Sequence, residues 1–159
     1  MKRENTFLKT MAFFACGLAI LLSMVALQGC EKPKGSFKVD GCYAELESGV
    51  LTLSFEGNAT TGYDWVASIP DSATGAVKLT QDEYVSETST DAVGAGGRHV
   101  FALKGTGDAS GSVTVEFKYT RSWESTSDDK TATVELGFDA SGNINSVNYS
   151  CDGSTASIN

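Results

Sequence analysis

The chain is poor in the residues that most catalytic and metal sites need. Its 159 residues include one histidine, four cysteines and two prolines, and 12 basic residues stand against 20 acidic ones. The lone His99 and a few scattered cysteines do not supply four clustered ligands, so we expect no metal and no cofactor. The acidic balance disfavours a nucleic-acid partner, which requires basic patches. Because no serine or cysteine lies in a recognisable activating motif, a hydrolase is disfavoured too.

The first thirty residues have the features of an export signal. Lys2, Arg3 and Lys9 precede an uncharged run over residues 11–27, and Leu27-Gln28-Gly29-Cys30 closes it. A basic head, an apolar middle and small residues before a cut site are typical of a secretory signal. The ending resembles the bacterial lipobox, so we expect residues 1–29 to be removed and Cys30 to be lipidated. An uncleaved membrane helix is the alternative, since a span needs about 20 apolar residues.

The remaining chain, residues 30–159, is long enough for one domain with its own core. Without the first 29 residues, which hold three basic residues and one acidic residue, 9 basic and 19 acidic residues remain. Within residues 30–36, the positions that follow Cys30 are polar and include proline and glycine. This composition is typical of a short linker. We therefore expect a monomeric domain, tethered to a membrane of the bacterial envelope and facing the periplasm or the exterior.

Strand patterns dominate the domain, and no helical period of useful length is present. Residues 113–120 alternate apolar and polar side chains over eight positions, and residues 51–55 and 132–138 do the same. This period is typical of half-buried strands. Shorter candidates are residues 37–39, 43–46, 63–67, 77–80, 99–103 and 144–150. The pattern predicts an all-β domain over residues 37–151, a sandwich of seven to nine strands, followed by a polar tail over residues 152–159.

Two cysteines remain in the predicted domain, near its opposite ends. Cys42 continues the core-facing period of Ala44 and Leu46, and Cys151 continues that of residues 147–149. In an exported protein such a pair most simply forms a disulfide, which the sequence therefore predicts. Two free thiols in the core are the alternative.

Three short motifs between the predicted strands carry the functional signal. They are Asn58-Ala59-Thr60-Thr61-Gly62-Tyr63-Asp64-Trp65, Gly94-Ala95-Gly96-Gly97 and Arg121-Ser122-Trp123. Each is ordinary turn chemistry when taken alone, because asparagine and glycine tolerate turn dihedrals. Trp65 lies within a predicted strand and is expected in the core, whereas Trp123 lies in a polar stretch and is expected at the surface.

In this order and spacing, the motifs resemble the loops of the chagasin family, small β-sandwich proteins that inhibit papain-like cysteine peptidases. The family's loops read N-P-T-T-G-(Y/F)-x-W, G-x-G-G and R-P-(W/F), and the resemblance covers roughly residues 48–136. It implies an immunoglobulin-like sandwich and a reversible, non-covalent blockade of the peptidase's cleft by the three loops, without any catalytic residue of its own. The residues that the resemblance assigns to peptidase binding are Asn58, Thr60, Thr61, Gly62, Gly94, Gly96, Gly97, Arg121 and Trp123.

The resemblance also implies that each loop contacts a different part of the peptidase. Residues 58–62 would enter the catalytic centre with Thr61 beside the reactive thiol, residues 94–97 would lie along the cleft, and Trp123 would stack beyond the centre. Two positions depart from the family, because Ala59 and Ser122 stand where it has proline. Since proline pre-organises a loop, we expect the two losses together to lower affinity by up to about tenfold. The alternative function is an adhesion or assembly module that simply displays polar loops.

Overall fold

The structure of this chain is a computed structural model that describes residues 34–87 and 96–159. The predicted signal, the predicted lipid acceptor Cys30 and the predicted binding residue Gly94 lie outside the described residues. The chain divides into two units, Met1–Glu31 and Lys32–Asn159, and the second contains every described strand and the buried core. Within the described ranges, no helix has the length and apolar character needed to cross a membrane.

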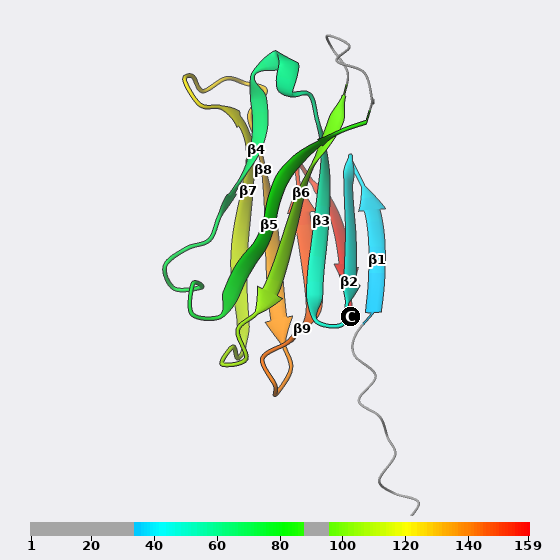
Figure 1. Ribbon diagram of the computed structural model, residues 1–159, viewed down its shortest axis with the longest axis vertical. Coiled ribbons are helices and arrows are strands. Elements are labelled where there is room, and N and C mark those ends of the chain that lie inside the picture. Colours follow the sequence, from blue (N-terminus) through cyan, green and yellow to red (C-terminus); the bar gives the residue numbers. More distant parts are fainter. Residues whose placement is uncertain (1–33, 88–95) are drawn as a thin grey trace, which may run out of the picture. The chain divides into compact units, whose positions relative to one another are not determined.

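The described residues form two five-stranded antiparallel sheets (Figure 1). The strand order is β1-β2-β3-β6-β5 in the first sheet and β10-β9-β8-β7-β4 in the second. The strand bounds are β1 Lys34–Val39, β2 Cys42–Glu47, β3 Val50–Gly57, β4 Tyr63–Ser68, β5 Val77–Ser86, β6 Gly97–Gly105, β7 Ser112–Arg121, β8 Lys130–Phe138, β9 Ile144–Cys151 and β10 Ser154–Ile158. A 3-10 turn, η1 over Ala59–Thr61, lies between β3 and β4.

The predicted all-β sandwich is confirmed, and each of the nine predicted strand segments lies within an observed strand. The structure differs at both ends of the domain. β1 begins at Lys34, inside the predicted linker. Ser154–Ile158, predicted as part of a polar tail, is a tenth strand that pairs with β9 and buries Ile158. Asp152 and Gly153, both with positive φ, form the two-residue turn that this hairpin requires.

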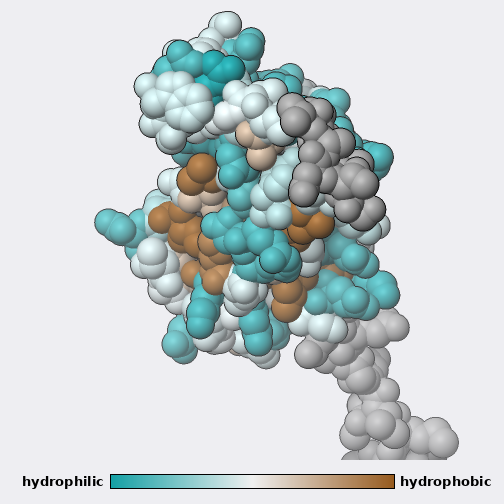
Figure 2. Space-filling view, turned by 45° about the horizontal axis from the view of Figure 1, so that its top comes forward, coloured by the Kyte–Doolittle hydropathy of each residue, from teal (hydrophilic) through white to brown (hydrophobic). Residues whose placement is uncertain are grey.

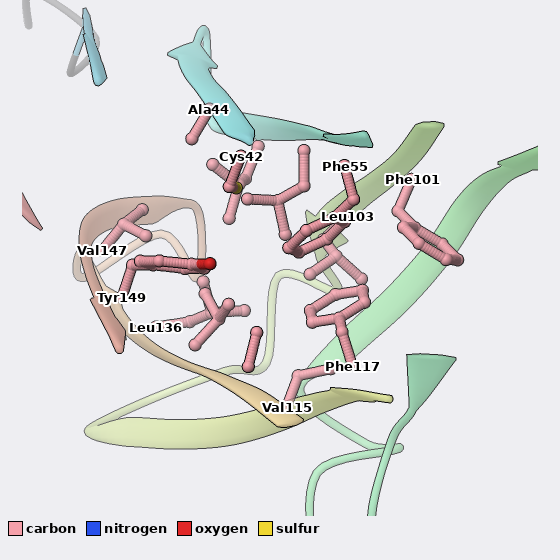
Figure 3. Close-up of a cluster of buried hydrophobic side chains, with 14 of the residues drawn as sticks. Cys42, Ala44, Phe55, Phe101, Leu103, Val115, Phe117, Leu136, Val147 and Tyr149 are labelled. Atoms are coloured by element: carbon pink, nitrogen blue, oxygen red, sulfur yellow. The ribbon is translucent and has the colours of Figure 1, made fainter. Parts of the chain in front are cut away.

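The inner faces of the two sheets meet in an aromatic and aliphatic core (Figure 3). The rings of Phe55 and Trp65 stack with centroids 4.3 Å apart, and Phe117 lies 5.3 Å from Phe55. The indole Nε1 of Trp65 donates a hydrogen bond to the Glu56 carbonyl at 3.0 Å, which satisfies its polar atom inside the core. The prediction that Trp65 is a core residue is therefore confirmed.

Cys42 and Cys151 both face the core, as the period predicted, but the predicted disulfide is absent. Both are buried free thiols, and the Tyr149 side chain interacts with each of them. Figure 3 shows Tyr149 and Cys42 among the buried side chains. Burial raises the pKa of the Cys42 thiol to about 12 and also raises the pKa of the Cys151 thiol. Thiol–disulfide exchange proceeds through the thiolate, so these two groups are poor partners for it near neutral pH.

Candidate functional site

The predicted motifs lie at one end of the sandwich, because the strands that flank them begin or end there. β3, β5 and β7 all finish at this end, which carries η1 and the connection between β7 and β8 at the top of Figure 1. Gly57 at the end of β3 pairs with Gly97, and Tyr63 at the start of β4 pairs with Arg121. We call residues 58–62, 96–97 and 121–129 the loop end.

The first loop is held by its own side chains. Asn58 caps η1: its Oδ1 accepts hydrogen bonds from the Thr60 backbone N–H at 3.1 Å and from the Thr60 hydroxyl at 2.6 Å. The Thr61 hydroxyl donates to the Asn58 carbonyl at 2.7 Å. The loop ends at Gly62, whose φ of 82° is left-handed and favours glycine. These bonds supply part of the order that the family's proline would otherwise give.

Ala59→Pro is expected to stabilise the domain by about 0.4–1 kcal/mol, because it restricts the unfolded chain at a position already suited to proline. Asn58 has φ −136° and ψ 96°, the extended form that a residue before proline prefers, and Ala59 is the first residue of η1. Urea unfolding of the wild type and the variant measures the difference. Thr60→Pro is the matched control: it removes the N–H that donates to Asn58 and should destabilise instead. A lower stability for Ala59→Pro would contradict this reading of the loop.

Trp123 joins the third loop to the first. Its side chain is 67% exposed, which confirms that it lies at the surface. Its indole nevertheless rests on Gly62, since a Cβ added there would lie 2.9 Å from Cζ2 of the ring and nearer still to Cη2. Two features therefore require a glycine at Gly62: its positive φ and the close approach of the indole. Gly62 and Trp123 are 61 residues apart in the chain, and their contact joins two motifs into one continuous surface.

Arg121 supports the turn that presents Trp123. Its guanidinium lies 4.6 Å above the centre of the Tyr63 ring, and its Nη1 forms an ion pair with Glu124. The hydrogen bond to Glu124 raises the pKa of the Arg121 side chain. A backbone bridge also joins Arg121 and Glu124 across the turn. Arg121 thus holds the loop from within.

Asp129 orders the rest of this loop, and the sequence analysis did not identify it. Its carboxylate accepts hydrogen bonds from Ser125 at 3.0 Å, Thr120 at 3.2 Å and Thr126 at 3.3 Å, and Thr126 also bonds to the Tyr63 hydroxyl. Partial burial works against ionisation, but the hydrogen bonds outweigh it, and the pKa of Asp129 lies below its ordinary value. Its stabilising effect is therefore complete above about pH 4 and is lost in stronger acid. The cluster of serine, threonine and aspartate residues in this stretch is the sequence feature that could have predicted these side-chain hydrogen bonds.

The second loop is described only where it enters β6. Gly96 is exposed, whereas Gly97 is buried as the first residue of the strand. A Cβ on Gly97 would lie 2.6 Å from the Val85 carbonyl and would overlap the Tyr84 phenol. Gly97 therefore permits close packing of β5 against β6, and Gly96 is the described glycine of this motif that faces outward.

The loop end presents side chains of a few kinds. Its exposed residues are small, polar or aromatic, and its colour in Figure 2 is mainly white and teal, with little of the strongly hydrophobic brown. In the described part of the chain, no three histidine, cysteine, aspartate or glutamate residues are arranged to hold a metal. Fold and site together define a β-sandwich protein that displays a surface of small, polar and aromatic residues at one end.

Comparison with known proteins identifies the family. The model of the chagasin family of peptidase inhibitors matches residues 48–137, which is more than half of the 159-residue chain. The chain therefore belongs to the chagasin family, whose members are peptidase inhibitors. The matched range contains all three motifs, so the resemblance drawn from them is confirmed.

One solved structure is similar over part of its length. A cysteine protease inhibitor from Entamoeba histolytica is 27% identical in sequence, with a TM-score of 0.40. The match covers 48% of this chain and 66% of that chain. Among curated proteins, none matches this chain.

Proposed function

We propose that this chain is a reversible, non-covalent inhibitor of papain-like cysteine peptidases, which blocks the active-site cleft with residues 58–62, 94–97 and 121–123. The observation that carries the proposal is the packing of the exposed Trp123 ring on Gly62. This contact joins two motif loops into one surface at the end of the sandwich, which we call the wedge. Membership in a family of peptidase inhibitors supports the class of target.

The first loop has the properties that a cleft-blocking segment needs. Bonds within residues 58–61 hold a tight turn, so the loop loses little conformational freedom when it binds. The Thr61 hydroxyl donates its proton to the Asn58 carbonyl and accepts a long hydrogen bond, 3.4 Å, from the Tyr63 backbone N–H, which leaves one oxygen lone pair to accept a hydrogen bond from the partner. An exposed indole in the third loop adds the kind of side chain that dominates interface energies.

The site of action follows from the first thirty residues of the sequence. We propose that Cys30 carries a lipid and tethers the domain to a membrane of the bacterial envelope, where it faces the periplasm or the exterior. The run of residues 11–27 and the Leu27-Gln28-Gly29-Cys30 ending support this proposal. Metabolic labelling with a fatty acid, compared between the wild type and Cys30→Ala, tests it: label on both proteins would contradict it.

Thr61→Ala is expected to weaken inhibition of papain by about 5- to 30-fold, the equivalent of one hydrogen bond in a buried interface. Inhibition constants are measured with residues 32–159, the unit that holds all described strands. Thr61→Ser keeps the hydroxyl and should inhibit nearly as well as the wild type. Thr114→Ala, an exposed threonine near the opposite end of β7, is the matched control and should change nothing. Equal effects of Thr61→Ala and Thr114→Ala would count against the loop assignment.

A further inference from the structure

A cavity opens at the loop end, and residues of both sheets line it. Glu56 and Gly97 belong to the first sheet, and Trp65, Tyr119 and Cys151 belong to the second. Its volume is about 820 Å³, which lies within the range that protein cavities use for small ligands. Since Trp65 and Cys151 are buried, the cavity reaches from the surface to the core.

The floor of the cavity is apolar. The rings of Trp65 and Tyr119 have centroids 5.2 Å apart, and a stacked ring covers one face of each, Phe55 in the first case and Tyr63 in the second. A Cβ on Gly57 would lie 3.6 Å from Cε2 of Tyr119 and 3.7 Å from Cδ1 of Trp65. Because glycine has no side chain, the edges of both rings stay uncovered at this point. They offer an apolar surface to an alkyl chain.

Charged side chains form the rim of the cavity. Four carboxylates and one ammonium group line it, all on exposed residues: Asp40, Glu56, Glu87, Asp152 and Lys130. Two of the carboxylates already have partners. Glu56 forms an ion pair with Arg98 at 3.2 Å, and Asp40 accepts a hydrogen bond from the Ser154 hydroxyl. Among the residues that the structure describes, none forms a hydrogen bond or an ion pair with the carboxylate of Glu87 or Asp152.

Floor and rim together select the chemistry of the occupant. The excess of carboxylates disfavours an anion, and the apolar floor gives no ligand to a small hydrated metal ion. A lysine or arginine side chain suits both parts, because it carries a cationic head on an alkyl stem that packs against apolar surface. Its head group would donate charge-assisted hydrogen bonds to the two free carboxylates.

The position of the cavity indicates where such a side chain comes from. Asn58, Gly96 and Gly97 line the cavity and also belong to the residues that we assign to peptidase binding. A peptidase that is seated on the loop end therefore covers the mouth of the cavity. A basic side chain beside the cleft of that peptidase would enter the cavity as the complex forms.

We propose that the cavity receives a lysine or arginine side chain of the peptidase, and that Glu87 and Asp152 thereby select peptidases with a basic residue beside the active-site cleft. This inference rests on the proposed function and adds the specificity of the same surface. Lys130 repels the incoming cation, so removal of its charge strengthens binding. A purely structural role for these exposed residues predicts no such opposite effects.

A titration with a small molecule tests this chemistry without a peptidase. Trp65 and Trp123 are the two tryptophans of the chain, so isotope-labelled residues 32–159 give two indole N–H signals, and Trp123→Ala assigns them. The Trp65 indole donates to the carbonyl of Glu56, a residue that lines the cavity. We expect N-acetyl-arginine methylamide to shift the Trp65 signal, with half-saturation at a roughly millimolar concentration. The neutral N-acetyl-citrulline methylamide should leave the signal unchanged.

Charge variants extend the test to the peptidase. The double variant Glu87→Gln, Asp152→Asn should weaken both the binding of the arginine derivative and the inhibition of papain, by roughly three- to tenfold. Lys130→Gln should strengthen both by about twofold or more. Asp108→Asn is the matched control: it removes an exposed carboxylate from the connection between β6 and β7 at the opposite end, and it should change neither.

The two assays separate this inference from the proposed function. If papain is not inhibited, the proposed function fails, and the titration still decides what the cavity binds. A Trp65 signal that stays unchanged with the arginine derivative, or that moves equally with the citrulline derivative, would overturn the proposal. Binding of the arginine derivative, together with papain inhibition that every charge variant leaves unchanged, would also overturn it, because the occupant would then be a free basic molecule rather than a side chain of the peptidase.

Discussion

Trp123→Ala is expected to weaken inhibition of papain by roughly 30- to 1000-fold, the largest loss that we expect from a single side chain. The estimate corresponds to about 2–4 kcal/mol, which is typical of an interface tryptophan that becomes fully buried. The free domain should be little affected, because the ring is 67% exposed and its observed packing is against Gly62. Binding and folding are therefore separable at this position.

Two further variants sharpen this test. Trp123→Phe keeps an aromatic ring and should lie between the wild type and the alanine variant. Val66→Ala removes another exposed apolar side chain, which is 54% exposed on β4 away from the loop end, and should leave inhibition unchanged. Inhibition constants for papain and urea unfolding curves are measured for all of them. Full inhibition by a folded Trp123→Ala variant would mean that the third loop lies outside the interface.

Gly62→Ala is expected to damage both stability and inhibition. An alanine at a left-handed φ of 82° costs about 1–2 kcal/mol of unfolding free energy, and its Cβ forces the Trp123 ring away. Since the ring and the first loop then no longer share one surface, inhibition of papain should fall by at least about tenfold beyond any loss of folded protein. Urea unfolding and inhibition constants measure the two effects separately.

Gly111 provides the matched control for this variant. It has a similar φ of 74°, and a Cβ there meets no other atom within 4 Å. Gly111→Ala should thus reproduce the backbone cost while leaving inhibition intact. In a Trp123→Ala background, Gly62→Ala should cost less binding than it does in the wild type, because the ring that it displaces is gone. Equal inhibition by Gly62→Ala and Gly111→Ala would contradict the proposed wedge.

Local patterns predicted the strands well wherever a strand has one buried and one exposed face. Residues 113–120 show this most clearly, since the alternation there follows the burial of β7. The pattern did not predict β10 as a strand, because four of its five side chains are serine, threonine or alanine. Its one large apolar residue, Ile158, lies at its end. The pairing with β9 defines this strand, and the local alternation of apolar and polar residues cannot reveal that pairing.

The loop motifs were visible in the sequence, but the residues that support them were not. The bond between Tyr63 and Thr126 joins residues that are 63 apart in the chain, and the contacts of His99 with Asp64 and Asp82 span 35 and 17 residues. These pairs depend on the register of neighbouring strands and on the closure of the sheet edges. The predicted disulfide failed for a related reason: the inward direction of Cys42 and Cys151 follows from the period, whereas bond formation does not.

The central claim is that this domain blocks a papain-like peptidase with its loop end. Its most direct test is a titration of papain with residues 32–159, following hydrolysis of a small fluorogenic peptide, with trypsin as a control of another catalytic class. We predict that papain activity falls in proportion to added domain, approaches zero near a one-to-one ratio and returns on dilution, while trypsin is unaffected. Full papain activity in the presence of excess folded domain would contradict the account.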